Sequence, residues 1–89
     1  MEYHVEVSGR VQGVGFRYFT LRVAEYLGIN GWVRNTIDGK VEIVAQGNES
    51  EVKEFLMKVK KGPSTAEVTA IKIDEINLNK KYNSFDIKF

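Results

Sequence analysis

Ten residues near the N-terminus hold three glycines and two arginines: Ser8-Gly9-Arg10-Val11-Gln12-Gly13-Val14-Gly15-Phe16-Arg17. Glycines spaced this closely permit positive φ angles and let backbone N–H groups approach a ligand without Cβ atoms in the way. A helical pattern follows, and the first N–H groups of a helix lack internal partners and attract negative charge. Arg17 falls in that first turn, where a cation is unfavourable unless an anion lies beside it, and its forked donors suit phosphate. We interpret the segment as an anion-binding loop, with a plain strand-to-helix turn as the alternative for the glycines alone.

Two common phosphate-binding loops do not fit this segment. The dinucleotide-binding fingerprint needs a small residue where Tyr18 stands, and no Gly-Lys-Ser/Thr follows Gly9 at the spacing of a nucleotide-binding loop. The sequence therefore gives no support to a dinucleotide or nucleoside triphosphate site of either kind.

The length of 89 residues limits the protein to one small core, since such a chain buries roughly 60 to 65% of its unfolded surface. We expect residues 1–89 to form a single domain with a shallow site. The sequence has no cysteine, which argues against a disulfide framework and favours a cytoplasmic protein. Thirteen Lys and Arg oppose twelve Asp and Glu, so the net charge of +1 does not recruit nucleic acid or membrane. No segment is long enough to span a membrane.

A strand and a helix are predicted on the two sides of the glycine-rich loop. Residues 3–8 alternate between apolar and polar side chains, as in a half-buried strand. The helix ends at Gly28. Its apolar stripe, at spacings of three and four, consists of Phe16, Phe19, Val23 and Leu27.

Residues 29–36 and 40–47 are predicted to form a hairpin whose register decides where its polar side chains point. A two-residue turn would bury the charge of Arg34. A three-residue loop with a left-handed Gly39 instead pairs Arg34 with Glu42 on the outer face and turns Asn35 to the side covered by helices. We therefore predict the three-residue loop. Asn35 can then lie beside Arg17; the alternative is that Asn35 only caps the hairpin.

The rest of the chain completes a βαββαβ order with a short terminal strand. Asn48 and Glu51 have the spacing of a capping box, and Gly62-Pro63 ends the helix that they begin. Residues 66–76 form the next strand, with a bulge because their apolar positions change phase, and residues 84–89 form the last one. The predicted fold class is α+β: a ferredoxin-like sandwich with a four-stranded antiparallel sheet, the terminal strand, and two helices on one face.

Over nearly its whole length the sequence resembles the acylphosphatase family. The residues 9–17 resemble the family's phosphate loop, and Gly31-Trp32-Val33-Arg34-Asn35-Thr36 with Asp38-Gly39 resembles its second signature. The resemblance implies hydrolysis of acyl phosphates to carboxylate and inorganic phosphate. Arg17 is then the catalytic phosphate binder, and Asn35 is the catalytic residue that orients the attacking water. The expected substrate-binding residues are Gln12, Gly13, Val14, Gly15, Phe16 and Arg17.

An acyl phosphate releases a weakly basic carboxylate, so its hydrolysis needs no general acid. This agrees with a sequence whose one histidine, His4, is expected to be solvated on the outer face. We expect no metal, no cofactor, no nucleic-acid partner and a monomeric protein. Two alternatives remain: a module that binds phosphate or carbamoyl phosphate without hydrolysis, and an RNA-binding domain of the same topology. The sequence indicates no specificity pocket, so it does not predict the physiological acyl phosphate.

Overall fold

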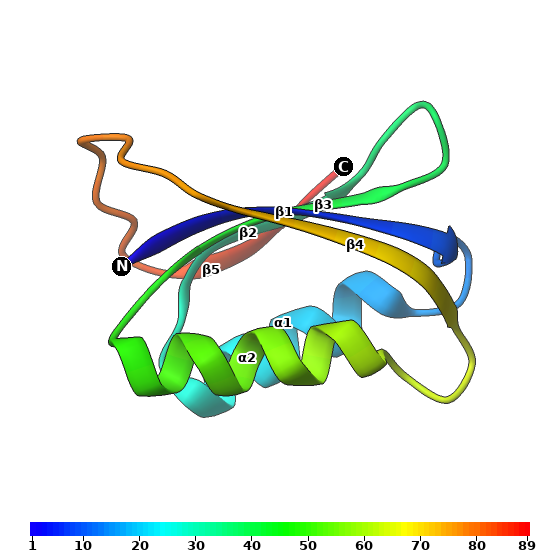
Figure 1. Ribbon diagram of the computed structural model, residues 1–89, viewed down its shortest axis with the longest axis horizontal. Coiled ribbons are helices and arrows are strands. Elements are labelled where there is room, and N and C mark those ends of the chain that lie inside the picture. The colour runs from blue at the N-terminus through cyan, green and yellow to red at the C-terminus, as the bar shows by residue number, and fades with distance from the viewer.

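The computed structural model describes residues 1–89 and contains five strands and two helices (Figure 1). Their order along the chain is that expected from the sequence. The elements are β1 (Glu2–Arg10), α1 (Phe16–Leu27), β2 (Asn30–Asn35), β3 (Val41–Gln46), α2 (Glu49–Lys61), β4 (Glu67–Glu75) and β5 (Phe85–Lys88).

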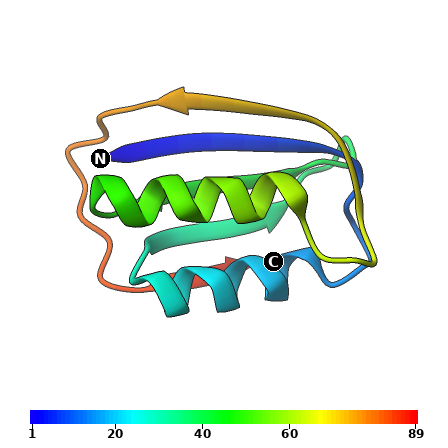
Figure 2. The same cartoon turned by 60° about the horizontal axis from the view of Figure 1, so that its bottom comes forward.

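The strands form one sheet in the order β4-β1-β3-β2-β5. The first four pair antiparallel, and β5 extends the sheet by pairing parallel to β2. Both helices cover the same face of this sheet (Figures 1 and 2). The ferredoxin-like architecture, with two helices on one face and a short terminal strand, is therefore confirmed.

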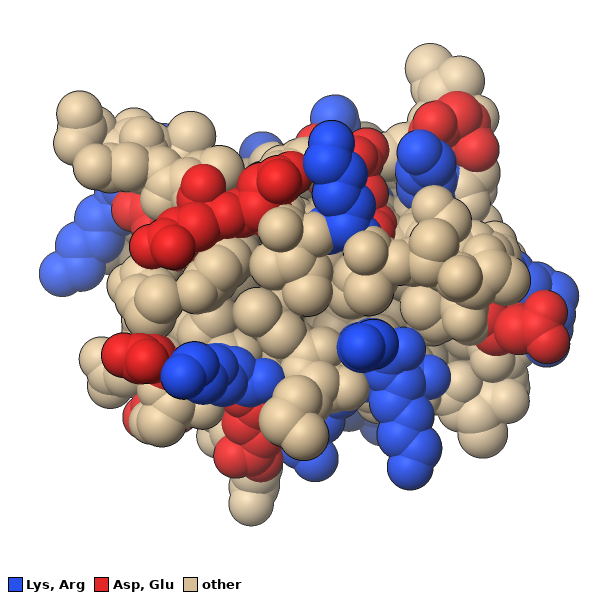
Figure 3. All heavy atoms as spheres, in the orientation of Figure 1, with Lys and Arg blue, Asp and Glu red and all other residues tan.

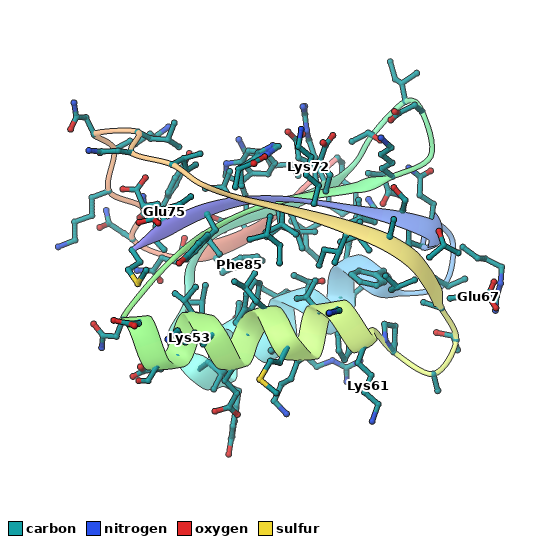
Figure 4. The ribbon with its side chains drawn as sticks, in the orientation of Figure 1. Lys53, Lys61, Glu67, Lys72, Glu75 and Phe85 are labelled. Carbon is teal, nitrogen blue, oxygen red and sulfur yellow. The ribbon has the colours of Figure 1, made fainter.

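The hydrophobic core lies between the sheet and the helices. Phe85 points into this layer (Figure 4), and its ring centroid lies 6.0 Å from that of Phe55 on α2. Phe16, at the start of α1, is only 1% exposed and ties the glycine-rich loop to the core. The deepest line on α1 differs from the predicted stripe: Thr20 and Ala24 are fully buried, whereas the larger side chains beside them are only partly covered. Together with Phe16, which the prediction included, these residues are spaced four apart along the buried side of α1.

The register of the β2–β3 hairpin agrees with the prediction. Arg34 pairs with Glu42 and Asn35 pairs with Val41, while Gly39 has a φ of 90° in the three-residue loop. Val41 is fully buried, so Asn35 shares its face with the core. This register places the Asn35 side chain on the helix-covered side of the sheet.

Two finer predictions had different outcomes. The bulge between β1 and β4 is confirmed, because Ser8 pairs with Ala70 whereas Gly9 pairs with Val68 and one β4 residue is left over. The capping box is wrong. Asn48 is the N-cap of α2 but makes no side-chain cap hydrogen bond, and the hydroxyl of Ser50 donates to Glu51 at 2.6 Å instead.

The outer face of the sheet carries a charged cluster. Glu42 binds His4 Nε2 and Arg34 Nε, each at 2.6 Å. We predicted a solvated His4 on this face; His4 does lie on it, but its ring is paired with a carboxylate. Trp32 donates to the hydroxyl of Tyr82 at 3.2 Å, and Lys88 lies over the Trp32 ring at 4.5 Å. Acidic and basic side chains are interspersed over the view in Figure 3. Trp32 and Tyr82 are thus bound to each other on this face, and the absence of a nucleic-acid partner stays a prediction.

Stability at acidic pH should depend on Glu42. Partial burial raises the pKa of this carboxyl, but the hydrogen bonds from His4 and Arg34 outweigh that effect and lower the pKa overall. The contacts therefore stabilise the fold above the unfolded-state pKa of about 4.3 and are lost as the pH falls through the lower folded-state value. We expect Glu42→Gln to reduce the free energy of unfolding at pH 7 by about 1 kcal/mol, and by less at pH 3.

Urea denaturation at both pH values measures this difference. Glu54→Gln is the matched control, because Glu54 is an exposed glutamate of α2 without an ion pair. An equal loss of stability for Glu42→Gln at pH 3 and pH 7 would contradict the assigned role.

Candidate active site

The loop between β1 and α1 has the backbone conformation that its glycines allow. Gly13 and Gly15 have φ values of 73° and 80°, in the left-handed region that other residues rarely adopt. A Cβ built on either glycine would meet no protein atom within 4 Å. The glycines are thus required by their backbone angles, and the space beside them is open.

The peptide N–H groups of residues 12–18 donate to no protein acceptor. The hydrogen-bond ladder of α1 begins only with the N–H of Phe19, which donates to the carbonyl oxygen of Gly15 at 3.0 Å. Gly15 is the N-cap of α1, with no side-chain cap and no acidic residue in the first turn. Free N–H donors at the positive end of a helix are available to an anion, and anion binding by this segment stays a prediction.

Arg17 lies in the first turn of α1 and has no carboxylate within 4.0 Å. Its guanidinium lies over the ring of Phe89, 5.0 Å from the ring centroid. β5 runs parallel to β2 with Lys88 beside Arg34; Phe89 directly follows β5, and Asn35 is the last residue of β2. Arg17 and Asn35 are therefore positioned at the same end of the sheet.

Asn35 carries a buried polar atom without a partner. Its Oδ1 is the one side-chain nitrogen or oxygen in the protein that is buried and makes no hydrogen bond. The hairpin is capped by Thr36, whose hydroxyl accepts from the N–H of Lys40 at 3.0 Å and donates to Asp38. The hydrogen bond from Thr36 also lowers the pKa of Asp38. Capping therefore does not account for Asn35, and an orphaned acceptor is costly unless a ligand or water uses it.

Gln12 joins the loop to the hairpin. Its Nε2 donates to the carbonyl oxygens of Thr36 and Lys40, each at 2.8 Å. We expected Gln12 among the substrate-binding residues, but its side chain is engaged with protein, so only its backbone N–H is available. The same holds for Phe16, whose side chain belongs to the core. The side chain of Gln12 fixes the loop relative to the strand that carries Asn35.

A second contact fixes the loop on its other side. The hydroxyl of Thr65, in the connection between α2 and β4, donates to the carbonyl oxygen of Val14 at 2.7 Å. Arg10 in turn donates to the carbonyl oxygen of Thr65, also at 2.7 Å. Thr65 could not be found from the sequence, because a single threonine 51 residues from Val14 matches no motif.

The site is open to solvent and simple in composition. The molecule has no enclosed pocket. No group of three or more His, Cys, Asp or Glu residues gathers where a metal ion could be held. Neither helix combines the length and apolar character that crossing a bilayer requires. The structure is a small ferredoxin-like sandwich with free N–H donors in the loop between β1 and α1.

Comparison with known proteins agrees with the resemblance seen in the sequence. The acylphosphatase family model matches residues 3–87. An acylphosphatase of Bacillus velezensis is 44% identical over 89 residues, which cover 100% of this chain and 99% of that protein. An acylphosphatase of Thermotoga maritima is 48% identical over 85 residues, which cover 96% of this chain and 93% of that protein. The crystal structure of acylphosphatase from Bacillus subtilis superimposes with a TM-score of 0.94 at 41% identity, covering 99% of this chain and 98% of that one.

The chain belongs to the acylphosphatase family. It is a hydrolase acting on acid anhydrides, and it converts acyl phosphates to carboxylate and inorganic phosphate. A similar domain also occurs within a longer protein: full-length HypF, crystallised in a phosphate- and nucleotide-bound form, matches with a TM-score of 0.88 at 27% identity over 12% of its chain. The relatives named acylphosphatase are matched over nearly their whole length, so a module without hydrolytic activity is not favoured.

Proposed function

We propose that residues 1–89 act as one catalytic domain in which the loop holds the phosphoryl group and Asn35 orients the attacking water. The N–H groups of residues 12–16 and the guanidinium of Arg17 bind the phosphoryl oxygens. The buried, unpartnered Oδ1 of Asn35 accepts a hydrogen bond from the water and directs a lone pair of that water at phosphorus. This orphaned acceptor at the same end of the sheet as Arg17 is the observation that carries the proposal.

The reaction requires charge stabilisation and positioning more than proton transfer. Water attacks phosphorus, the bond between phosphorus and the carboxyl oxygen breaks, and the carboxylate leaves with the bonding electrons. A proton of the water passes to a phosphate oxygen, so no side chain needs to act as a general base. The loop donors and Arg17 stabilise the charge on the phosphoryl oxygens while the bond breaks. The free donors of the loop are suited to this because they need no rearrangement before they bind.

Hydrolysis of benzoyl phosphate in ¹⁸O-labelled water tests the proposed direction of attack. We expect the label in inorganic phosphate and none above background in benzoate, as judged by mass spectrometry. Rates with and without a chelator should be equal. Spontaneous hydrolysis without enzyme, run in parallel, gives the background. Label in the carboxylate would show attack at the carbonyl carbon and would remove the role proposed for Asn35.

The monomeric state, the cytoplasmic location and the absence of a nucleic-acid partner stay predictions. Support for the last comes from the nearly balanced charge, with 13 basic and 12 acidic residues, which provides no net field to attract a polyanion.

A further inference from the structure

The connection between α2 and β4 lies beside the anion-binding loop, on the right of Figures 1 and 2. Thr65 in this connection contacts the loop through its hydroxyl, and its carbonyl oxygen accepts from Arg10 at the end of β1. At the start of the connection, a Cβ built on Gly62 would lie 3.0 Å from the ring of Phe16. The connection thus contacts the loop through the Thr65 side chain and the start of α1 through the backbone at Gly62.

The hydrogen bond from Thr65 determines which way one loop peptide faces. In a trans peptide unit the C=O and the N–H point in opposite directions, and this chain has no cis peptide bond. The carbonyl oxygen of Val14 faces Thr65 at 2.7 Å. The N–H of Gly15, which belongs to the same peptide unit, therefore points away from Thr65. It has no protein acceptor.

This peptide needs an external restraint because glycine follows it. Reversing the Val14–Gly15 peptide changes mainly ψ of Val14 and φ of Gly15, and glycine adopts both signs of φ about equally well. The positive φ of 80° at Gly15 is therefore one of two accessible arrangements. In the reversed arrangement the carbonyl oxygen would face the anion and repel it.

We propose that Thr65 is a positioning residue, which holds the Val14–Gly15 peptide so that the Gly15 N–H faces the phosphoryl group. The inference rests on the proposed function of the loop and assigns a role to a residue outside it. Arg10 supports the arrangement, because its Nη1 donates to the Thr65 carbonyl oxygen at 2.7 Å and fixes the connection against β1.

Thr65→Val tests the proposal, since valine has nearly the same shape without the hydroxyl. Inorganic phosphate is the probe, used as a competitive inhibitor of benzoyl phosphate hydrolysis. We expect its inhibition constant to rise about three- to tenfold, as loss of one hydrogen bond predicts, and kcat to fall by a similar factor. Thr65→Ser should restore both values. Thr65 is exposed, so the midpoint of urea denaturation should change little.

The Gly15 amide gives a direct signature. In ¹⁵N-labelled wild-type protein its NMR signal should shift when phosphate is added, and in Thr65→Val the shift at saturation should be smaller. Ser64→Ala is the matched control, because it removes a neighbouring exposed hydroxyl that makes no hydrogen bond. A purely structural Thr65 would alter the denaturation midpoint and leave the inhibition constant and the Gly15 shift unchanged.

Arg17→Ala, measured in parallel, separates failure of this inference from failure of the proposed function. If Arg17→Ala binds phosphate as the wild type does, the loop is not the phosphate site and both proposals fall. If Arg17→Ala no longer binds phosphate, while Thr65→Val binds phosphate normally and shows an unchanged Gly15 shift, only the role of Thr65 is overturned. Weaker binding in both variants, with Thr65→Ser restored, supports the inference.

Discussion

An Arg17→Ala variant should release phosphate from benzoyl phosphate at least about 1,000-fold more slowly than the wild type, at equal protein and subsaturating substrate. Removal of one preorganised donor in an anion site typically costs about 100- to 1,000-fold in turnover. Arg17 carries a full charge and also binds the ground state, so kcat should fall and KM should rise together. Its guanidinium has no carboxylate partner to compete with the substrate.

Loss of activity in Arg17→Ala should not come from loss of folding. A cation in the first turn of a helix opposes the helix dipole by about 0.3 to 1 kcal/mol, which is comparable with its cation–π contact to Phe89. The free energy of unfolding should therefore stay within about 1 kcal/mol of the wild type. Arg22→Ala, on the same helix and exposed, is the matched control and should retain full activity. Near-normal turnover of Arg17→Ala would refute the phosphate-binding role.

The hairpin shows why much of the fold could be predicted from the sequence. Burying the charge of Arg34 without a partner is costly, and a register shift of one residue would bury it. This one side chain was therefore enough to select the register in which Arg34 pairs with Glu42. The same register determines the face of Asn35. Alternation and charge are local properties of the sequence, and where they decide the structure the prediction is correct.

Contacts between distant segments could not be predicted in this way. The hydrogen bonds from Gln12 to the hairpin and from Thr65 to Val14 join residues that are 24 to 51 positions apart. Their donors are common polar residues, and only the folded chain brings each one to its acceptor. The capping box failed for a different, local reason: the hydroxyl of Ser50, one residue away, donates to the carboxylate of Glu51.

Asn35→Ala is expected to separate turnover from binding. If Asn35 orients water and does not hold phosphate, kcat should fall about 100-fold or more, as for other single positioning donors and acceptors, while KM and the inhibition constant of phosphate change by less than about threefold. Steady-state kinetics on benzoyl phosphate, with inorganic phosphate as inhibitor, measure both quantities. Asn83→Ala, an exposed asparagine without a side-chain hydrogen bond, should behave like the wild type.

The stability of Asn35→Ala provides an independent check, because the buried Oδ1 of this residue has no partner. An unsatisfied buried acceptor costs about 1 to 3 kcal/mol, so its removal should leave the free energy of unfolding unchanged or raise it by about 1 kcal/mol. An active site that orients water is expected to retain such a cost, since the acceptor must be free when the water arrives. A variant that is markedly less stable, with kcat unchanged, would show that Asn35 serves the hairpin and not the reaction.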